Sequence, residues 1–251
     1  MESDPLLLTA VAIWCFVVAL IGGAVGLVFG NIRLPAIVAV ATGPAAGAGA
    51  NVGISGIAAT AAAIVHIRAG RIDWRIFAWM APPSMVGAVA GGYASGLLPD
   101  TVLLIVIGAM LLWFGVRMLR PGERVKRAEE AEPSLVGIVV SGFGIGVLGG
   151  LIGLILGALR MPALLRWVGG SAHQAVGTNL AVGVCVGVAG VLGHTPAGVD
   201  WDLLAIGAAA SVPGALLGSQ LTGKLSEPQL LKGIGAMLVV AGGAMLVQAA
   251  I

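Results

Sequence analysis

Two arginines in this sequence have the spacing and the surroundings of an anion-binding pair. Arg33 and Arg160 each precede a proline by two positions, in Arg33-Leu-Pro35 and Arg160-Met-Pro162, and both interrupt long apolar runs. Because proline is favoured in the first turn of a helix, each segment predicts the start of a new helix. The positive end of the helix dipole and a guanidinium group would then point to one place, a combination that suits carboxylate, sulfonate or sulfite oxygens.

Uncharged polar side chains follow each arginine and could complete such a site. These are Asn51, Ser55, Thr178 and Asn179, with His173 and Gln174 shortly before the last two. Amide and hydroxyl groups can donate to oxyanion atoms, and a histidine can also change its protonation state. The alternatives are hydrogen bonds between helices, helix caps or, for the arginines, contacts with lipid phosphates. The matched placement of the two arginines favours the site.

Composition indicates the class of protein that must position these groups. Of the 251 residues, 59% are hydrophobic and 10% are charged, and the mean hydropathy is +1.06. A soluble domain carries about 25% charged residues, and apolar runs near the ~20 residues that cross a bilayer recur along this chain. The sequence therefore predicts an all-α polytopic membrane protein with about 8 membrane segments. The net charge of +2 argues against nucleic acid as a partner.

Two regions do not read as single straight spans. Residues 36–67 are too long for one span and too short for two, and glycines and a proline interrupt them at 43–44 and 47–51. The region that follows residue 158 is also apolar and interrupted by polar residues, glycines and a proline. We expect a broken or re-entrant helical hairpin in each, with helix breaks at Pro35, Pro44 and Pro162. The other apolar segments, 6–29, 75–98, 102–119, 135–158, 203–221 and 230–250, are expected to span the bilayer.

An internal repeat is the main signal of domain organisation. At a shift of 127 positions many residues coincide, and the segment 107–111 recurs letter for letter at 234–238. The matched pairs include Arg33 and Arg160, Asp73 and Asp200 and, after a one-residue gap, Asn51 and Asn179, and His66 and His194. The chain therefore divides into a first repeat, 1–119, a linker, 120–134, and a second repeat, 135–251.

The charges of the loops predict that the two repeats face opposite ways. Arginine and lysine mark cytoplasmic loops, and they gather in the linker and in the loop at 68–75. The matching loop at 195–202 has two aspartates and no basic residue. Because this change of sign is what inverted repeats produce, we expect inverted halves joined by a cytoplasmic linker. Four plain spans per half, arranged in parallel, are the alternative.

Residues 149–190 carry a further pattern. It consists of Gly153 and Gly157, Pro162 with Leu164, then His173 and the run Ala-Val-Gly-Thr-Asn-Leu at 175–180. This pattern resembles the signature of the TauE/SafE family of membrane transporters, the sulfite-exporter-like permeases, with Gln174 inserted after the histidine. The similarity extends over both repeats and implies an inner-membrane carrier of small anions such as sulfite, organosulfonates or sulfoacetate. The two arginines depart from the glycine cluster that the family often has there, so the exact anion stays open.

These features together predict a secondary transporter, and no enzyme, that exports small sulfur oxyanions by alternating access. The predicted site comprises Arg33, Asn51, Ser55, Arg160, His173, Gln174, Thr178 and Asn179. An anion channel is the main alternative, followed by a membrane scaffold or an intramembrane enzyme. We expect no cofactor or metal, because the sequence has no metal-ligand cluster and no nucleophile–base set. The expected partners are the anion and the lipid bilayer, with a coupling proton and an oligomer left open.

Overall fold

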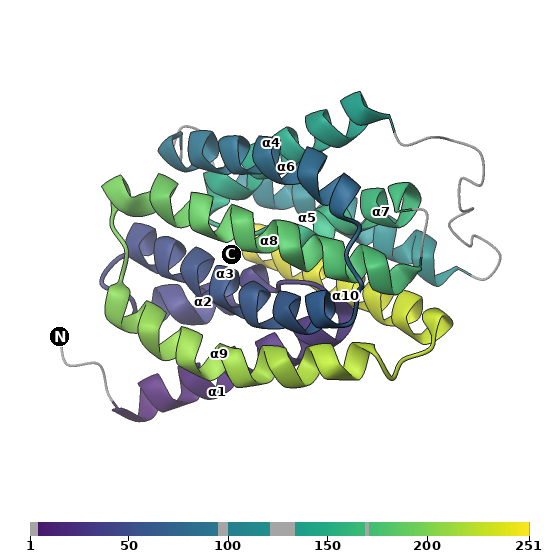
Figure 1. Cartoon of the computed structure of the whole chain (residues 1–251). Helices are drawn as coiled ribbons and strands as arrows, with labels where there is room; N and C mark the ends of the chain where they lie inside the picture. Colours follow the sequence, from purple (N-terminus) through teal and green to yellow (C-terminus); the bar gives the residue numbers. More distant parts are fainter. Residues whose placement is uncertain (1–4, 95–99, 121–133, 169–170, 251) are drawn as a thin grey trace.

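The computed structural model describes residues 5–94, 100–120, 134–168 and 171–250, and all regular structure in these ranges is helical. The predicted all-α class is therefore confirmed. The first repeat contains α1 (Pro5–Val25), α2 (Gly30–Val40), α3 (Pro44–Arg68), α4 (Trp74–Tyr93) and α5 (Asp100–Leu119). The second contains α6 (Leu135–Ile152), α7 (Gly157–Trp167), α8 (Ala172–His194), the 3-10 turn η1 (Thr195–Ala197), α9 (Trp201–Thr222) and α10 (Glu227–Ala250). The helices lie side by side in one bundle (Figure 1).

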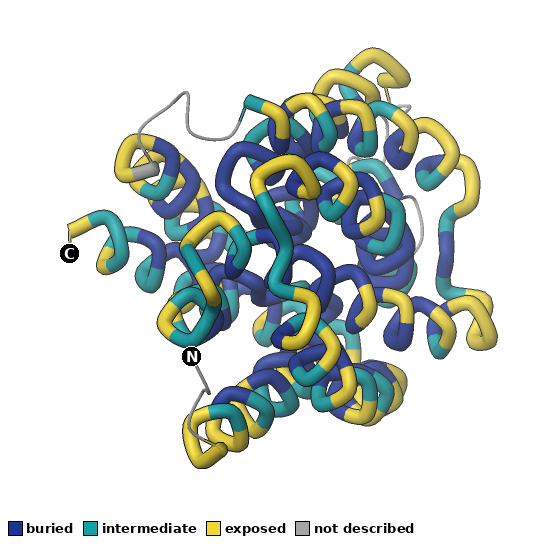
Figure 2. The backbone as a smooth tube through the Cα atoms, turned by 90° about the vertical axis from the view of Figure 1, so that its left-hand side faces the viewer, coloured by how far each residue is buried: buried dark blue, intermediate teal, exposed yellow. Residues whose placement is uncertain are grey.

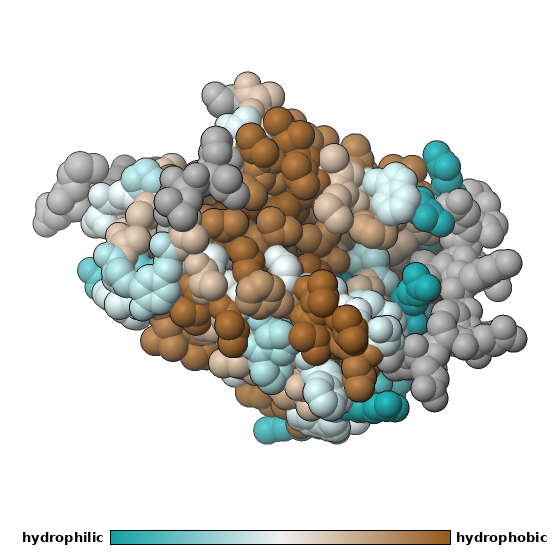
Figure 3. All heavy atoms as spheres, turned by 90° about the horizontal axis from the view of Figure 1, so that it is seen from above, coloured by the Kyte–Doolittle hydropathy of each residue, from teal (hydrophilic) through white to brown (hydrophobic). Residues whose placement is uncertain are grey.

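Within the described residues, seven helices are long and apolar enough to cross a membrane. These are α1, α3, α5, α6, α8, α9 and α10. Hydrophobic side chains dominate the middle of the face in Figure 3, and strongly hydrophilic ones lie toward its margins. Such a belt is what a bundle that crosses a bilayer presents to lipid. The predicted linker falls largely on residues 121–133, which lie outside the described ranges.

The centre of the bundle is formed by α3 and α8. Within an apolar stretch of 18 residues in each of these two helices, 72% of the residues are buried, against 33% in α1 and 28% in α5. Figure 2 shows the same distribution, with buried backbone toward the middle and exposed turns outside. The two helices approach closely where Gly56 faces Gly187, since a β-carbon on Gly56 would lie 3.0 Å from the Cα atom of Gly187. These central helices carry most of the predicted site residues.

Each outer helix packs against an outer helix of the other repeat. α1 packs along α9, α4 along α6, and α5 along α10. The matched helices α5 and α10 run antiparallel, because Gly108 lies against Gly242 while Gly115 lies against Gly235. α3 and α8 are also antiparallel, as their close contacts at 53 with 191 and 59 with 183 indicate. Antiparallel matched helices suit an inverted repeat, whose orientation in a membrane stays a prediction.

The breaks before α2 and α7 fall at glycines, which corrects the predicted role of two prolines. Gly26 and Gly153 follow the ends of α1 and α6 with φ of 70° and 71°, in the left-handed region that favours glycine. Pro35 and Pro162 lie inside α2 and α7, whereas Pro44 is the first residue of α3, as predicted. The interruption predicted at 47–51 is absent, because α3 runs through these residues as a continuous helix.

Pro35 is tolerated inside α2 because a neighbouring helix supplies the missing hydrogen bond. A residue at position 35 would normally donate its backbone N–H to the carbonyl oxygen of Asn31, and proline has no such donor. The side chain of Gln248 in α10 donates to this carbonyl instead, over 3.0 Å. Asn31 in turn donates from Nδ2 to the carbonyl oxygen of Ala241, over 3.2 Å. α10 thus holds α2 in place from one side.

Candidate functional site

Arg33 is the best-partnered of the predicted site residues. It is the fourth residue of α2, is 1% exposed, and extends its guanidinium toward α3. Its Nε donates to Oδ1 of Asn51 over 3.0 Å, and its Nη2 donates to the backbone oxygen of Asn51 over 3.0 Å and to Oγ of Ser55 over 2.5 Å. Asn51 also donates from Nδ2 to the carbonyl oxygen of Gly30, the first residue of α2. The structure therefore brings Arg33, Asn51 and Ser55 together at the start of a helix.

Arg160 occupies the matching place in α7 but has fewer partners. It is also 1% exposed, and its Nε donates to Oδ1 of Asn179 over 3.2 Å. Its Nη1 and Nη2 atoms are buried without a hydrogen-bond partner. Asn179 donates from Nδ2 to the carbonyl oxygen of Gly26 over 2.9 Å, and so links the second repeat to the helix break of the first. The structure brings Arg160 and Asn179 together, as predicted, but adds no hydroxyl.

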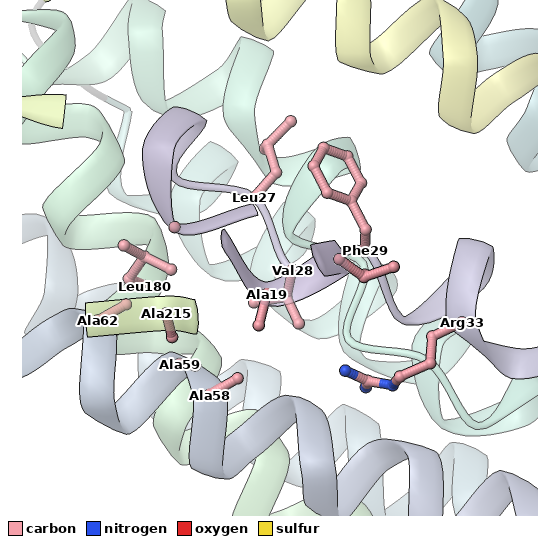
Figure 4. A pocket seen from close by; sticks show the side chains of 12 residues that line it. Ala19, Leu27, Val28, Phe29, Arg33, Ala58, Ala59, Ala62, Leu180 and Ala215 are labelled. Atoms are coloured by element: carbon pink, nitrogen blue, oxygen red, sulfur yellow. The ribbon is translucent and has the colours of Figure 1, made fainter. Parts of the chain in front are cut away.

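Ala59 of α3 lies between the surroundings of the two arginines. A small cavity of about 10 Å³ lies beside Arg33 and is otherwise lined by apolar and small residues, among them Ala58, Ala59 and Leu180. In Figure 4 the guanidinium of Arg33 points toward the helix that carries Ala58 and Ala59. Ala59 also faces Gly183, beside which the Nη2 atom of Arg160 lies. The two guanidinium groups thus approach α3 and α8 from opposite repeats.

Electrostatics sets this pair of arginines apart from ordinary buried side chains. No hydrogen-bond partner of Arg33 or Arg160 in the described residues is a carboxylate; all are amide, hydroxyl or backbone oxygens. A buried charge costs several kcal/mol unless it is paired or hydrogen-bonded. The positive ends of α2 and α7 lie close by, because Asn51 and Asn179 pack against Gly30 and Gly157, the first residues of those helices. The region therefore favours a negative ligand.

The other predicted residues of the second repeat lie nearer the start of α8. The hydroxyl oxygen of Thr178 accepts the backbone N–H of Asp73 over 2.9 Å, and so positions the start of α4. The Nε2 atom of His173 lies 3.2 Å and 3.1 Å from the carbonyl oxygens of Thr222 and Leu225, so it contacts the end of α9 and the turn that follows. His173 and the half-buried Gln174 precede Asn179 by roughly 9 Å or less along the helix. None of these three has a hydrogen bond to either arginine.

Sequence reasoning missed two residues that shape the site. Gly183 is the counterpart of Ser55 at the shift of 128 that pairs Asn51 with Asn179, so the alignment already contained this difference. Gln248, which completes the hydrogen bonding of α2, carried no signal in the sequence, because it comes from the last helix and pairs with a backbone oxygen. The matched aspartates Asp73 and Asp200 cap α4 and α9 by accepting the N–H groups of Ile76 and Leu203.

Comparison with known proteins bears on the identity of this bundle. The family model described as "Sulfite exporter TauE/SafE" matches residues 11–245. The chain belongs to the TauE/SafE family. It is a multi-pass membrane protein of a transporter family, which confirms the resemblance noted in the sequence.

Curated relatives of this TauE/SafE protein are transporters by description. The chain is 26% identical over 186 residues to "Probable membrane transporter protein y4hK" of Sinorhizobium fredii (strain NBRC 101917 / NGR234), an alignment that covers 70% of this chain and 72% of the relative. It is 30% identical over 145 residues to "Probable membrane transporter protein YjnA" of Bacillus subtilis (strain 168), which covers 57% of this chain and 56% of the relative. No solved structure matches the chain.

Proposed function

We propose that this TauE/SafE protein is a secondary transporter of small oxyanions in the cytoplasmic membrane, with Arg33 and Arg160 as its binding charges. The observation that carries the proposal is the burial of two guanidinium groups without a carboxylate partner, at the centre of a membrane bundle. A charge at this depth is costly unless something compensates for it, and a bound anion would do so. Membership of a transporter family makes passage across the membrane the purpose of such binding.

The chemistry of the groups favours an anion with several oxygens. Guanidinium groups donate in a planar fork that matches carboxylate, sulfite or sulfonate oxygens, and amide side chains add neutral donors. The family description names sulfite and export, which makes sulfite export the first activity to test. The surrounding side chains, such as Ala58, Ala59 and Leu180, are small or apolar and offer no bulky recognition element. The proposed substrate class is therefore a small sulfur oxyanion.

Alternating access suits the size of the cavity. The space beside Arg33, about 10 Å³, is near the minimum for one water molecule, so sulfite requires the helices around it to separate. The lining comes from α1, α2, α3, α8 and α9, so that both repeats contribute to the wall. Relative movement of the repeats would open this wall to one side of the membrane at a time. A continuously open anion channel, the alternative, would need a wider path.

Uptake into proteoliposomes tests this function. We expect saturable uptake of radiolabelled sulfite that unlabelled sulfite or methanesulfonate competes for, and we expect Arg33→Ala and Arg160→Ala to lower it by roughly tenfold or more, since each removes charged hydrogen bonds. Arg68→Ala, at an exposed position of the last turn of α3, is the matched control. Full uptake by both buried-arginine variants would contradict the proposed site. Unitary anion currents across a planar bilayer would favour a channel instead.

A further inference from the structure

The two buried arginines differ in how their outer edges are used. The Nη2 atom of Arg33 donates to both Ser55 and the backbone of Asn51, so hydrogen bonds from within its own repeat hold that edge. Both Nη atoms of Arg160 are buried, and neither has a partner. An unpaired buried donor on a charged group carries a large desolvation penalty. The second repeat therefore leaves unpaired the Nη2 donors that the first repeat pairs internally.

A sequence difference between the repeats removes one of these acceptors, the hydroxyl. Ser55 follows Asn51 by four positions, and the residue that follows Asn179 by four positions is Gly183. A β-carbon built on Gly183 would lie 4.0 Å from Nη2 of Arg160, and 3.5 Å from Cβ of Ala59, which is ordinary van der Waals contact. A serine would therefore fit at 183, and its hydroxyl could reach Arg160 as Ser55 reaches Arg33. Glycine at 183 removes that internal acceptor.

We propose that Gly183 keeps the Nη1–Nη2 edge of Arg160 open as the docking edge for the substrate oxyanion, while Ser55 and the backbone of Asn51 occupy the Nη2 atom of Arg33. This inference rests on the proposed function and assigns the two arginines unequal roles. Arg160 binds the anion directly, and Arg33 supplies positive potential across Ala59. The Nη1–Nη2 edge presents two N–H groups in one plane, so the ligand is an anion with two coplanar oxygens, such as sulfite, a sulfonate or a carboxylate. A halide presents only one atom to the two donors, so we expect it to bind this edge more weakly than an anion with two oxygens.

The variant Gly183→Ser tests the proposal, because it supplies the missing hydroxyl within the protein. We expect the apparent Kd for sulfite, measured by calorimetry on the purified full chain in detergent, to rise tenfold or more relative to Gly183→Ala. The alanine variant adds the same β-carbon without the hydroxyl, so the ratio of the two isolates the hydrogen bond to Arg160. Gly144→Ser is a second control, since a β-carbon at Gly144 has no neighbour within 4 Å. We expect this control to bind sulfite like the unaltered protein.

The outcomes separate the inference from the function on which it rests. Equal sulfite affinities of the serine and alanine variants, with thermal unfolding showing that both are folded, would overturn the role of Gly183. Chloride competing with sulfite as strongly as methanesulfonate does would overturn the two-oxygen ligand. If the unaltered protein bound neither sulfite, methanesulfonate nor acetate, the proposed function itself would fail. Weaker sulfite binding confined to Gly183→Ser would support both the role of Gly183 and the proposed function.

Discussion

At the residue scale, two asparagines each hydrogen-bond a buried guanidinium group without neutralising its charge. Asn51 accepts from Nε of Arg33 and donates to the carbonyl oxygen of Gly30, while Asn179 accepts from Arg160 and donates to the carbonyl oxygen of Gly26. An aspartate in either place would form an ion pair and cancel the charge that an anion needs. An amide orients the guanidinium and leaves its positive charge available. Both asparagines also bind the backbone at the break between α1 and α2, so each holds a guanidinium group and a backbone carbonyl with one side chain.

The first residue-scale prediction concerns Asn51. Leu has a side chain of similar size to Asn. Replacing Asn51 with Leu removes the hydrogen bond from Nε of Arg33 and the hydrogen bond to the carbonyl oxygen of Gly30, so the buried charge of Arg33 keeps fewer partners. We expect a loss of roughly 2–5 kcal/mol in stability, seen as a lower midpoint of thermal unfolding in detergent. Ser219→Ala is the control, because the Ser219 hydroxyl donates only within α9, to Ala215 over 2.6 Å. A shift no larger than that of the control would show that Asn51 does not support Arg33.

At the element scale, the short helices α2 and α7 are positioned by left-handed glycines. Backbone N–H groups of Leu27 and Leu154 donate to the carbonyl oxygens of Gly22 and Gly149 over 2.9 Å and 2.8 Å, closing both helix ends in the same way. The next helix then begins four residues after each glycine, which places an arginine in its first turn. The geometry of the site therefore depends on Gly26 and Gly153 as much as on the arginines.

This dependence predicts the effect of Gly26→Ala. The substitution places a β-carbon in the left-handed region at φ 70° and drives it against the side chain of Val176 in α8. Gly70→Ala is a matched control, because Gly70 has φ 65° but nothing within 4 Å of the added carbon. We expect the control to lose about 1 kcal/mol of folding stability from backbone strain alone. Gly26→Ala should lose distinctly more stability, and thermal unfolding of both variants measures the difference. Equal losses would mean that contact with α8 contributes nothing.

The sequence predicted the elements better than their ends. Hydropathy predicts the long helices, and the repeat alone pairs Arg33 with Arg160 and Asn51 with Asn179. The helix breaks were placed at prolines, because a local rule cannot show that Gln248 repairs the hydrogen bond that Pro35 lacks. The same limit applies to Thr178, whose hydroxyl faces the start of α4 rather than an arginine. Long-range partners decide such cases, and local residue patterns do not encode them.

At the scale of the whole molecule, the distribution of charge follows the arrangement of the helices. Basic residues lie in the last turns of α3, α5 and α7, and these helix ends share one end of the bundle (Figure 1). The loop between α8 and α9, which carries Asp200, lies at the other end, where α9 begins with Asp202 in its first turn. The positive-inside rule predicts that the first end faces the cytoplasm. The end of α3 and the turn η1, which occupy matching positions in the two repeats, would then lie on opposite sides of the membrane.

Cysteine labelling tests this topology at two matched alanines. Ala69 follows α3 and Ala197 ends η1; both are exposed, and the shift of 128 that pairs His66 with His194 also pairs them. The background would carry Cys15→Ala and Cys185→Ala, since both native cysteines are free. We expect a membrane-impermeant maleimide to label Ala197→Cys in intact cells, and Ala69→Cys only after the membrane is permeabilised.

Labelling distinguishes the inverted from the parallel arrangement of the repeats, because the two differ in the side of the membrane on which matched loops lie. Inverted repeats place matched loops on opposite sides, whereas parallel repeats place them on the same side. Full labelling of both variants after permeabilisation is the control for thiol reactivity. If intact cells labelled both positions, or neither, the inverted arrangement would be wrong. Arg33 and Arg160 would then enter the membrane from one side, and a site built from two opposed repeats could not form.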